Sequence, residues 1–293
     1  MSAAPSPPHT QNSKGLKTYL SFVKFEHTLF ALPFAYGGML LAANGWPGFM
    51  TFLWITLAMV GARTASMALN RVIDAEVDAR NPRTKAREIP RGVLRRREGL
   101  WLAVAGFALL ILSGWALNAL TLALLPIAVF FLALYPYTKR FTWLCHYWLG
   151  LTIGAAAAGG WIAVTGAFAP AAIALWAGVG LWIAGFDIIY AVLDHDFDVA
   201  HGIYSVPAAF GVGRALNISA LTHVVAWLAL ALVLPLTRTG WPYALGLGVV
   251  AAILVAQHIL VRRRNVGDVL RSFNANLYVS AVMLLAILVD VIL

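Results

Sequence analysis

Two acidic segments interrupt stretches of sequence that otherwise have the composition of membrane helices. The chain has twelve Asp and Glu residues, of which three fall within 74–78 and four within 187–198. A carboxylate at membrane depth is costly unless it is paired, bound to a metal ion or open to a wet cavity. These two segments are therefore candidates for a site that binds a cation.

The spacing of the acids strengthens this interpretation. Asn70, Asp74 and Asp78 are four residues apart, so in a helix they stack on one face. The second segment has the same property, with steps of three, four and four residues between Asp187, Tyr190, Asp194 and Asp198. Two helices that each present a stripe of carboxylates can hold divalent cations between them, and Mg²⁺ bridged to phosphate oxygens is the usual occupant of oxygen-only sites. Glu76 and Asp196 fall on the other helical face and are not expected to be ligands.

The rest of the chain has the composition of an integral membrane protein. Hydrophobic residues make up 61% and charged residues 11% of the 293 residues, and the mean hydropathy is +0.80. Charged residues approach a quarter of an ordinary soluble domain, so that class is excluded. We predict an all-α polytopic membrane protein with a flexible tail over residues 1–15, no cleaved signal peptide, and a single membrane-embedded domain over residues 16–293.

Nine apolar stretches are long enough, at about 20 residues, to cross a bilayer as helices. They lie near residues 19–43, 49–79, 98–118, 120–137, 142–165, 170–196, 213–236, 241–262 and 270–292. With nine spans, nearly all the basic loop residues share one side of the membrane, and the loops of the other side are uncharged apart from Arg238. Because cytoplasmic loops carry the excess of Lys and Arg, the N-terminus and both acidic segments are predicted to face the cytoplasm.

This charge asymmetry has two further consequences. The net charge of +9 is explained by membrane orientation, so no nucleic-acid partner is expected, and no obligate protein partner is evident. Either acidic segment alone would be explained as well by solvated carboxylates at a helix end. Their joint occurrence on one membrane side favours a functional site. The single cysteine, Cys145, permits no disulfide within the chain and is expected to serve packing.

Several basic residues are placed to bind an anion beside the acids. Arg83 and Arg87 lie in the loop that directly follows the first acidic segment, and Lys139 and Arg140 lie at the cytoplasmic end of the fourth span. Anchoring of the loops at the cytoplasmic surface would explain such residues too. These four, however, are positioned to meet a phosphate group beside bound metal ions.

Arg63 is a separate candidate, seven residues before Asn70 and two helical turns deeper on the same face. An arginine so far into an apolar span is a functional candidate by default. Its guanidinium fork suits a carboxylate, which suggests an acidic group on a substrate. An interhelical salt bridge is the alternative.

At these residues the chain resembles the UbiA superfamily of intramembrane prenyltransferases. The run from Asn70 to Asp78 matches the first aspartate-rich motif of that family, N-x-x-x-D-x-x-x-D, and the run from Asp187 to Asp198 matches the second, D-x-x-Y-A-x-x-D-x-x-x-D. Segments 81–87 and 135–140 resemble the flanking loops, and the resemblance covers nearly the whole chain after the tail. Within the superfamily the chain looks most like bacterial 4-hydroxybenzoate polyprenyltransferases and related naphthoate prenyltransferases of menaquinone biosynthesis.

The resemblance implies nine transmembrane helices around a central cavity, Mg²⁺ as cofactor, and a polyprenyl diphosphate and an aromatic acid as substrates. By this resemblance the catalytic, metal-binding residues would be Asp74, Asp78, Asp194 and Asp198. The substrate-binding residues would be Arg63, Asn70, Arg83, Lys139, Arg140, Asp187 and Tyr190. The implied reaction forms 3-polyprenyl-4-hydroxybenzoate for ubiquinone biosynthesis, in a bacterial plasma membrane and with the site open to the cytoplasm.

Two departures from the family pattern leave alternatives open. Arg71 stands where many members have Asp, and Tyr204 stands where ubiquinone-pathway enzymes often have Lys. Both raise the alternative that the acceptor is a dihydroxynaphthoate of menaquinone biosynthesis. Prenyltransferases that act on haem or on a glycerol phosphate are a third possibility within the family. A different class, an ion-coupled transporter, would also use acids inside the membrane, but its acids would trace a route across the bilayer.

Overall fold

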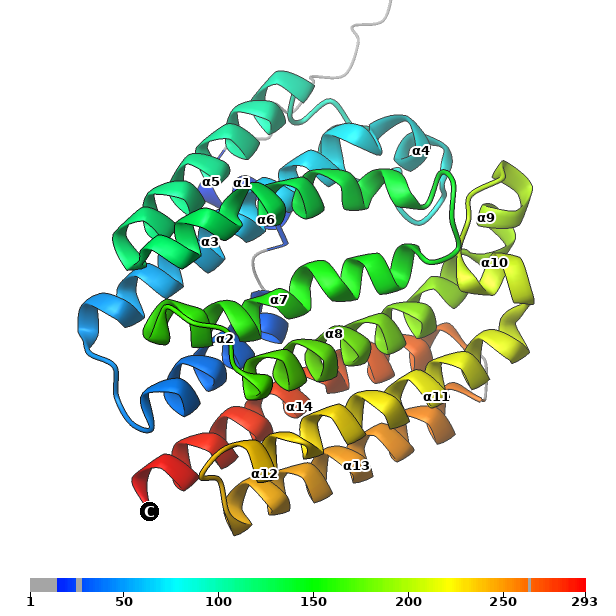
Figure 1. The fold of residues 1–293 in the computed structure, drawn as a ribbon. Helices are drawn as coiled ribbons and strands as arrows, with labels where there is room; N and C mark the ends of the chain where they lie inside the picture. Colours follow the sequence, from blue (N-terminus) through cyan, green and yellow to red (C-terminus); the bar gives the residue numbers. More distant parts are fainter. Residues whose placement is uncertain (1–14, 25–27, 263–264) are drawn as a thin grey trace, which may run out of the picture.

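A computed structural model of the chain describes residues 15–24, 28–262 and 265–293, and the regular structure of these residues is entirely helical, as predicted. Most of the expected tail lies outside the described residues. Within them, eight helices are long and apolar enough to cross a membrane (Figure 1). In chain order they are α3 (Phe49–Ile73), α5 (Arg96–Leu117), α6 (Ala119–Thr138), α7 (Cys145–Thr165), α8 (Pro170–Ala191), α11 (Val212–Ala231), α13 (Trp241–Val261) and α14 (Val266–Ile292).

The first predicted span, over 19–43, is divided between two helices. They are α1 (Leu16–Phe22) and α2 (Thr28–Ala43), and residues 25–27 lie outside the described part. At 1.5 Å per residue α2 is about 24 Å long, whereas the hydrocarbon core of a bilayer is about 30 Å thick. The prediction of nine spans is therefore not confirmed, although α2 is apolar and packs against α7 and α14 within the bundle.

Neighbouring helices approach closely where small residues face one another. α7 meets α8 at Gly150 and Gly180, where a Cβ on Gly150 would lie 2.1 Å from the Gly180 carbonyl oxygen. α3 meets α5 in the same way, since a Cβ on Gly61 would lie 2.7 Å from the Gly106 carbonyl oxygen. Helices in lipid gain little from apolar burial, so small residues that permit close packing decide which helices pair. These contacts hold α3 against α5 and α8 against α7, and α3 and α8 are the helices that carry the acidic segments.

Both acidic segments lie where a long helix breaks into shorter ones. The short elements there are α4 (Ala75–Arg80), the 3₁₀ turn η2 (Val192–Asp194), α9 (His195–His201) and α10 (Val206–Phe210), whereas α12 (Val233–Leu236) follows α11 elsewhere. The helices predicted over 49–79 and 170–196 are therefore not continuous. The break before α4 is slight, because the main-chain N–H groups of Asp74 and Asp78 still donate to the carbonyls four residues earlier, at 2.9 and 2.8 Å. The predicted stacking of these acids survives the break.

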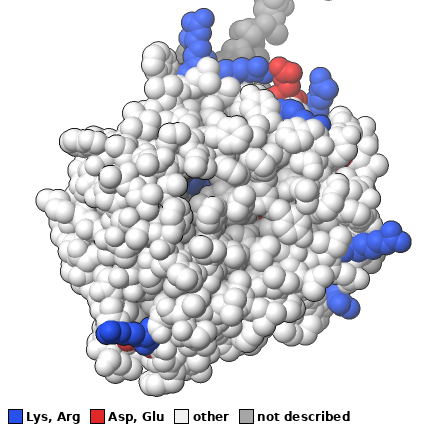
Figure 2. All heavy atoms as spheres, in the orientation of Figure 1, with Lys and Arg blue, Asp and Glu red and all other residues white. Residues whose placement is uncertain are grey.

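The broken helix ends and the charged loops gather at one end of the bundle. Helices α4, α9 and α10 lie together at the right of Figure 1, so both acidic segments arrive at the same place. Figure 2 shows the same face of the molecule almost free of charged side chains, with Lys and Arg gathered along its upper edge and a few at its sides. A hollow near the middle of this face has basic atoms inside it. Apart from that hollow, the face suits contact with lipid chains.

Candidate active site

The two acidic segments meet around a cavity of about 230 Å³ at the end of the bundle. Ten residues selected from the sequence line it: Asn70, Asp74, Asp78, Arg83, Arg87, Lys139, Asp187, Tyr190, Asp194 and Asp198. Glu76 and Asp196, expected on the other helical face, point away from it and are exposed, with Glu76 paired to Arg96 and Asp196 to His195. The helical spacing of the acids therefore predicted correctly which of them face a common space.

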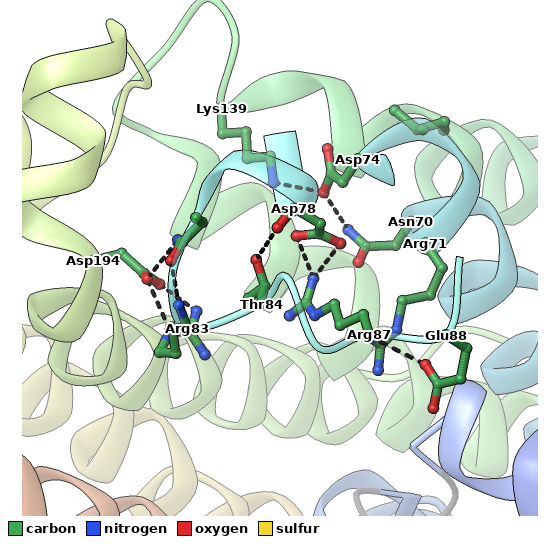
Figure 3. Close-up of polar contacts among 12 residues, drawn as sticks. Asn70, Arg71, Asp74, Asp78, Arg83, Thr84, Arg87, Glu88, Lys139 and Asp194 are labelled. Carbon is green, nitrogen blue, oxygen red and sulfur yellow. Dashed lines mark hydrogen bonds and ion pairs between the residues drawn. The ribbon is translucent and has the colours of Figure 1, made fainter. Parts of the chain in front are cut away.

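Asp74 lies at the break between α3 and α4 and is the most deeply buried acid of the site, with 1% of its surface exposed. Lys139 Nζ donates to its Oδ2 at 2.5 Å, and Asn70 Nδ2 donates to the same oxygen at 3.1 Å. Arg140 Nη2 donates to Oδ1 at 3.2 Å. Lys139 belongs to the turn that follows α6, and Figure 3 shows its side chain reaching across to Asp74.

Asp78, one turn further along, is held by the basic loop. Arg87 Nη1 donates to both of its carboxylate oxygens at 2.7 Å. The hydroxyl of Thr84 donates to the Asp78 carbonyl oxygen at 3.2 Å. These contacts fold the loop back over the acidic segment that precedes it, as Figure 3 shows.

Arg83 joins the two acidic segments. Its Nε donates to Asp194 Oδ1 at 2.8 Å, its Nη2 donates to Asp194 Oδ2, and its Nη1 donates to the Tyr190 hydroxyl at 2.9 Å. Asn81 Nδ2 also donates to Asp194 Oδ1, at 3.0 Å. Burial by itself would lower the pKa of the Arg83 guanidinium, but the hydrogen bonds and charge of Asp194, with Tyr190, outweigh it and raise that pKa. Arg83 therefore stays charged and carries the loop of one segment onto the other.

Sequence reasoning missed two residues that hold the second segment. His146, at the start of α7, is 4% exposed, and its Nδ1 lies 2.7 Å from Asp187 Oδ2. Ser205, which caps α10, donates from its hydroxyl to Asp198 Oδ2 at 2.9 Å. Neither residue has a motif or a spacing that marks it, because both contacts depend on the packing of α7 and α10 against α8. The one signal for His146 in the sequence is that it is a polar residue at the edge of an apolar stretch.

The donor set of the site fits Mg²⁺. Among the described residues, no three His, Cys, Asp or Glu side chains gather closely enough to hold a metal ion by themselves. Mg²⁺ does not need such a cage, because it is usually bound by one or two carboxylates together with water and substrate phosphates. Two pairs of carboxylates four residues apart, with cations beside them, match that requirement.

A second, larger cavity of about 660 Å³ adjoins the first. The two share five side chains with polar atoms: Asn70, Arg87, Tyr135, Asp187 and Tyr190. Beyond them the lining is mostly apolar, apart from Lys24, Arg63, Arg71 and three hydroxyl side chains, and comes mainly from α3, α6 and α7. It extends to Leu117, Phe168 and Trp176 at the far end of the bundle. A polar chamber thus adjoins a long, mostly apolar one.

Arg63 and Arg140 are the two selected residues that do not line the polar cavity. Arg63 lines the larger cavity, and its Nε and Nη2 donate to the carbonyl oxygens of Val23 and Lys24, at 3.2 and 3.1 Å. Its guanidinium therefore holds the end of α1 as well as facing the apolar space. Arg140 reaches Asp74 from outside the cavity and also donates to the Ile73 carbonyl oxygen at 3.1 Å.

Comparison with known proteins places these features in a family. The UbiA prenyltransferase family model matches residues 31–283, which include both acidic segments. A 4-hydroxybenzoate octaprenyltransferase from Methylococcus capsulatus is 32% identical over 291 residues, covering 97% of both chains. A protein of the same name from Alkalilimnicola ehrlichii is 32% identical over 257 residues, covering 86% of both chains.

Solved structures agree with the fold. The apo structure of a UbiA homolog from Aeropyrum pernix matches with a TM-score of 0.82 and 34% identity, covering 90% of this chain and 98% of that one. A UbiA homolog from Archaeoglobus fulgidus, solved with GPP and Mg²⁺, matches with a TM-score of 0.70 and 20% identity, covering 94% of this chain and 100% of that one. At that identity the second likeness concerns the fold alone.

Proposed function

The chain belongs to the UbiA prenyltransferase family, and we propose that it transfers a polyprenyl group from a polyprenyl diphosphate to the ring of 4-hydroxybenzoate. The observation that carries this proposal is the junction of the two cavities. A chamber of carboxylates and cations adjoins a long, mostly apolar space, and Asp187 and Tyr190 line both. A molecule with a diphosphate head and an isoprenoid tail needs such a pair of spaces. The names of the curated relatives support 4-hydroxybenzoate as the acceptor.

The polar chamber would hold the diphosphate. Asp74 and Asp78, and opposite them Asp194 and Asp198, would bind Mg²⁺, which would neutralise charge on the leaving diphosphate. A protein of the same fold, the homolog from Archaeoglobus fulgidus, was solved with GPP and Mg²⁺, which supports these ligands for the fold. Lys139 and Arg83 now pair with Asp74 and Asp194. Once those acids bind metal, the same two cations are free to contact phosphate oxygens.

The apolar cavity would hold the isoprenoid chain. Each CH₂ group moved out of water contributes about 0.8 kcal/mol, so a long tail binds strongly in such a space. The reaction then takes place at the junction, where the C–O bond to the diphosphate breaks and the ring carbon next to the hydroxyl attacks the allylic carbon. The faces of Tyr135 and Tyr190 can stabilise the allylic cation. Excluding water from the junction keeps the cation from simple hydrolysis.

Arg63 is our candidate for the carboxylate of the acceptor. It lines the larger cavity about 10 Å along α3 from Asn70, at 1.5 Å per residue, so it is too distant to be a main ligand of the diphosphate. Two of its nitrogens already donate to main-chain carbonyls. Such anchoring would hold the guanidinium in place for a bidentate contact with the acid.

A dihydroxynaphthoate remains the alternative acceptor. The two residues that favour it both line the site: buried Arg71 lines the larger cavity, and half-exposed Tyr204 lines the polar one. Family membership decides against an ion-coupled transporter, as does the gathering of acids and cations at one end of the bundle.

The decisive experiment offers purified protein in lipid vesicles one polyprenyl diphosphate and a panel of hydroxybenzoates and hydroxynaphthoates, and identifies products by mass. We expect prenylated 4-hydroxybenzoate with Mg²⁺ or Mn²⁺, and no product in EDTA. If the only product is a prenylated naphthoate, a naphthoate takes the place of 4-hydroxybenzoate as the proposed acceptor. Full turnover in chelated, metal-free buffer would rule out the metal-dependent mechanism.

A further inference from the structure

His146 is a buried histidine with a defined pattern of hydrogen bonds. Its Nδ1 lies 2.7 Å from Asp187 Oδ2, and its Nε2 lies 3.2 Å from the main-chain nitrogen of Val206. A main-chain N–H can only donate, so Nε2 must be the acceptor and carries no proton. The ring proton of the neutral imidazole is then on Nδ1, which donates to Asp187. The hydrogen-bond partners of the ring therefore determine its tautomer.

Asp187 differs from the other acids of the site. Asp74, Asp78 and Asp194 each accept from a Lys or Arg side chain, whereas Asp187 accepts from His146. Within the described residues its other oxygen, Oδ1, has no hydrogen-bond partner. The carboxylate is therefore held through one oxygen while the second is available.

The location of Asp187 decides what that available oxygen can do. Asp187 lines both the polar and the apolar cavity, about one turn before Tyr190, which also lines both. If the diphosphate head and the isoprenoid tail occupy these two spaces, the allylic carbon and the attacked ring carbon meet beside Asp187. In the described part of the chain, no Lys or Arg forms an ion pair with Asp187, as Arg83 does with Asp194.

We propose that Asp187 accepts the proton that leaves the acceptor ring, and that His146 is the positioning residue that aims it. This inference rests on the proposed prenyl transfer. The C–O bond to the diphosphate breaks and takes its electron pair with the diphosphate, and a C–C bond forms between the allylic carbon and the ring. The proton of that ring carbon passes to Asp187 Oδ1, its C–H electron pair restores aromaticity, and the proton then leaves to water.

His146 suits this role because both of its nitrogens are fixed. Val206 begins α10, whose cap Ser205 holds Asp198, so the imidazole is anchored to the backbone beside the second acidic segment. A carboxylate aimed by a hydrogen bond to such an anchor loses little rotational freedom during the reaction. Outer partners of this kind typically contribute about 10- to 100-fold to activity when they orient an inner group.

Two amide variants separate the two nitrogens of His146. The amide of His146→Asn places an N–H near the position of Nδ1 and can still donate to Asp187. The longer side chain of His146→Gln places its amide near Nε2, where it can accept from Val206 but no longer aims Asp187. We expect kcat of His146→Gln to fall about 10- to 100-fold, with KM for geranyl diphosphate nearly unchanged, and His146→Asn to recover most of the rate. His195→Gln, at a partly exposed histidine of the second acidic segment, is the matched control.

Two further readouts distinguish positioning from general damage. With 4-hydroxybenzoate deuterated at carbons 3 and 5, or the same label on whichever acceptor the panel identifies, the kinetic isotope effect on kcat should rise in His146→Gln. In a variant that already carries Asp187→Asn, adding His146→Gln should lower kcat little further. Three results would overturn the proposal. They are an impaired His146→Asn beside a normal His146→Gln, an unchanged isotope effect, and losses of kcat that multiply in the double variant.

A measurement without substrates tests the contact itself. In detergent-solubilised protein labelled with ¹⁵N at histidine, we expect the signals that disappear in His146→Asn to be those of a ring with Nδ1 protonated and Nε2 unprotonated. The opposite tautomer would overturn the proposal whatever the enzyme acts on. If wild-type protein makes no prenylated product from any acceptor, the proposed function fails. If wild type turns over and His146→Gln matches it, only the positioning role fails.

Discussion

Asp74 and Asp194 each sit between a cation and a hydrogen-bonding amide, so their negative charge is matched by the residues around it. Replacing either by Asn keeps the shape and removes the charge. We expect Asp74→Asn and Asp194→Asn each to lose at least about 10²-fold in kcat, the scale for removing one preorganised electrostatic group. Initial rates with a polyprenyl diphosphate and Mg²⁺ measure this.

Asp196→Asn is the control for these variants, because Asp196 belongs to the same acidic segment but is fully exposed and paired only with His195. It should keep near-normal activity. Near-normal rates in Asp74→Asn and Asp194→Asn as well would mean that the two acidic segments are structural.

Variants of Arg63 and Lys139 should each change KM for a different one of the two substrates. If Arg63 binds the carboxylate of the acceptor, Arg63→Ala should raise KM for the aromatic acid about 10- to 100-fold, the equivalent of a charge-assisted bond of about 1.5–3 kcal/mol, and leave KM for the diphosphate nearly unchanged. Lys139→Ala should show the reverse. Arg63→Lys should recover only part of the loss, because an ammonium group cannot reproduce the fork.

The structure adds a second reason to make the Arg63 variant. Its guanidinium holds the carbonyl oxygens of Val23 and Lys24, so a purely structural role would lower thermal stability and affect both substrates alike. That result would remove Arg63 from the acceptor site.

At the scale of single residues, helical spacing predicted which acids face a common cavity, because a four-residue step survives even where α3 breaks. It could not predict the partners of those acids. The contact from His146 to Asp187 joins residues 41 positions apart, and the contact from Arg83 to Asp194 joins residues 111 positions apart. Such pairs depend on how α7 and the basic loop pack onto α8, which no local pattern records.

At the scale of helices, apolar length predicted eight spans well and the first one poorly. Polar residues near the start of that stretch, such as Lys24, did not reveal that α1 and α2 are separate helices. The breaks near Asp74 and Val192 were missed for a related reason. Neither contains proline or glycine, so the sequence carries no sign of a helix end there, and the acids themselves continue the helical spacing.

The close approach of α7 to α8 gives a test at this scale. A Cβ on Gly150 would meet the Gly180 carbonyl oxygen, whereas a Cβ on Gly159, further along α7, would meet nothing within 4 Å. Gly150→Ala should therefore destabilise the protein by about 1–3 kcal/mol, as overpacking does, and lower its midpoint of thermal unfolding in detergent. Gly159→Ala should leave that midpoint unchanged or raise it, since Ala favours a helix by about 1 kcal/mol. Equal effects of the two variants would mean that this contact does not hold the helices together.

At the scale of the whole molecule, the two cavities explain why this chemistry belongs in a membrane. The polar chamber lies at the end of the bundle where the basic loops gather, and the apolar cavity runs from it toward the other end. An isoprenoid substrate already dissolved in the bilayer can keep its tail in apolar surroundings while its head reaches the charged end. The charge asymmetry of the loops predicts that the charged end faces the cytoplasm.

The number of crossings and the side of the N-terminus are linked, and a topology experiment decides both. Ser21 Oγ donates to Glu88 Oε1 at 2.8 Å, so α1 lies at the same end of the bundle as the basic loop. With α1 at that end, the prediction of nine spans has α2, although short, carry the chain across the membrane before α3. Reporters fused after Lys14 and within Arg83–Arg91 should therefore both read cytoplasmic, and one after Pro170 should read the opposite side. A reporter after Lys14 on the side opposite to Arg83–Arg91 would show that α2 does not cross, whereas a non-cytoplasmic basic loop would invert the orientation derived from charge.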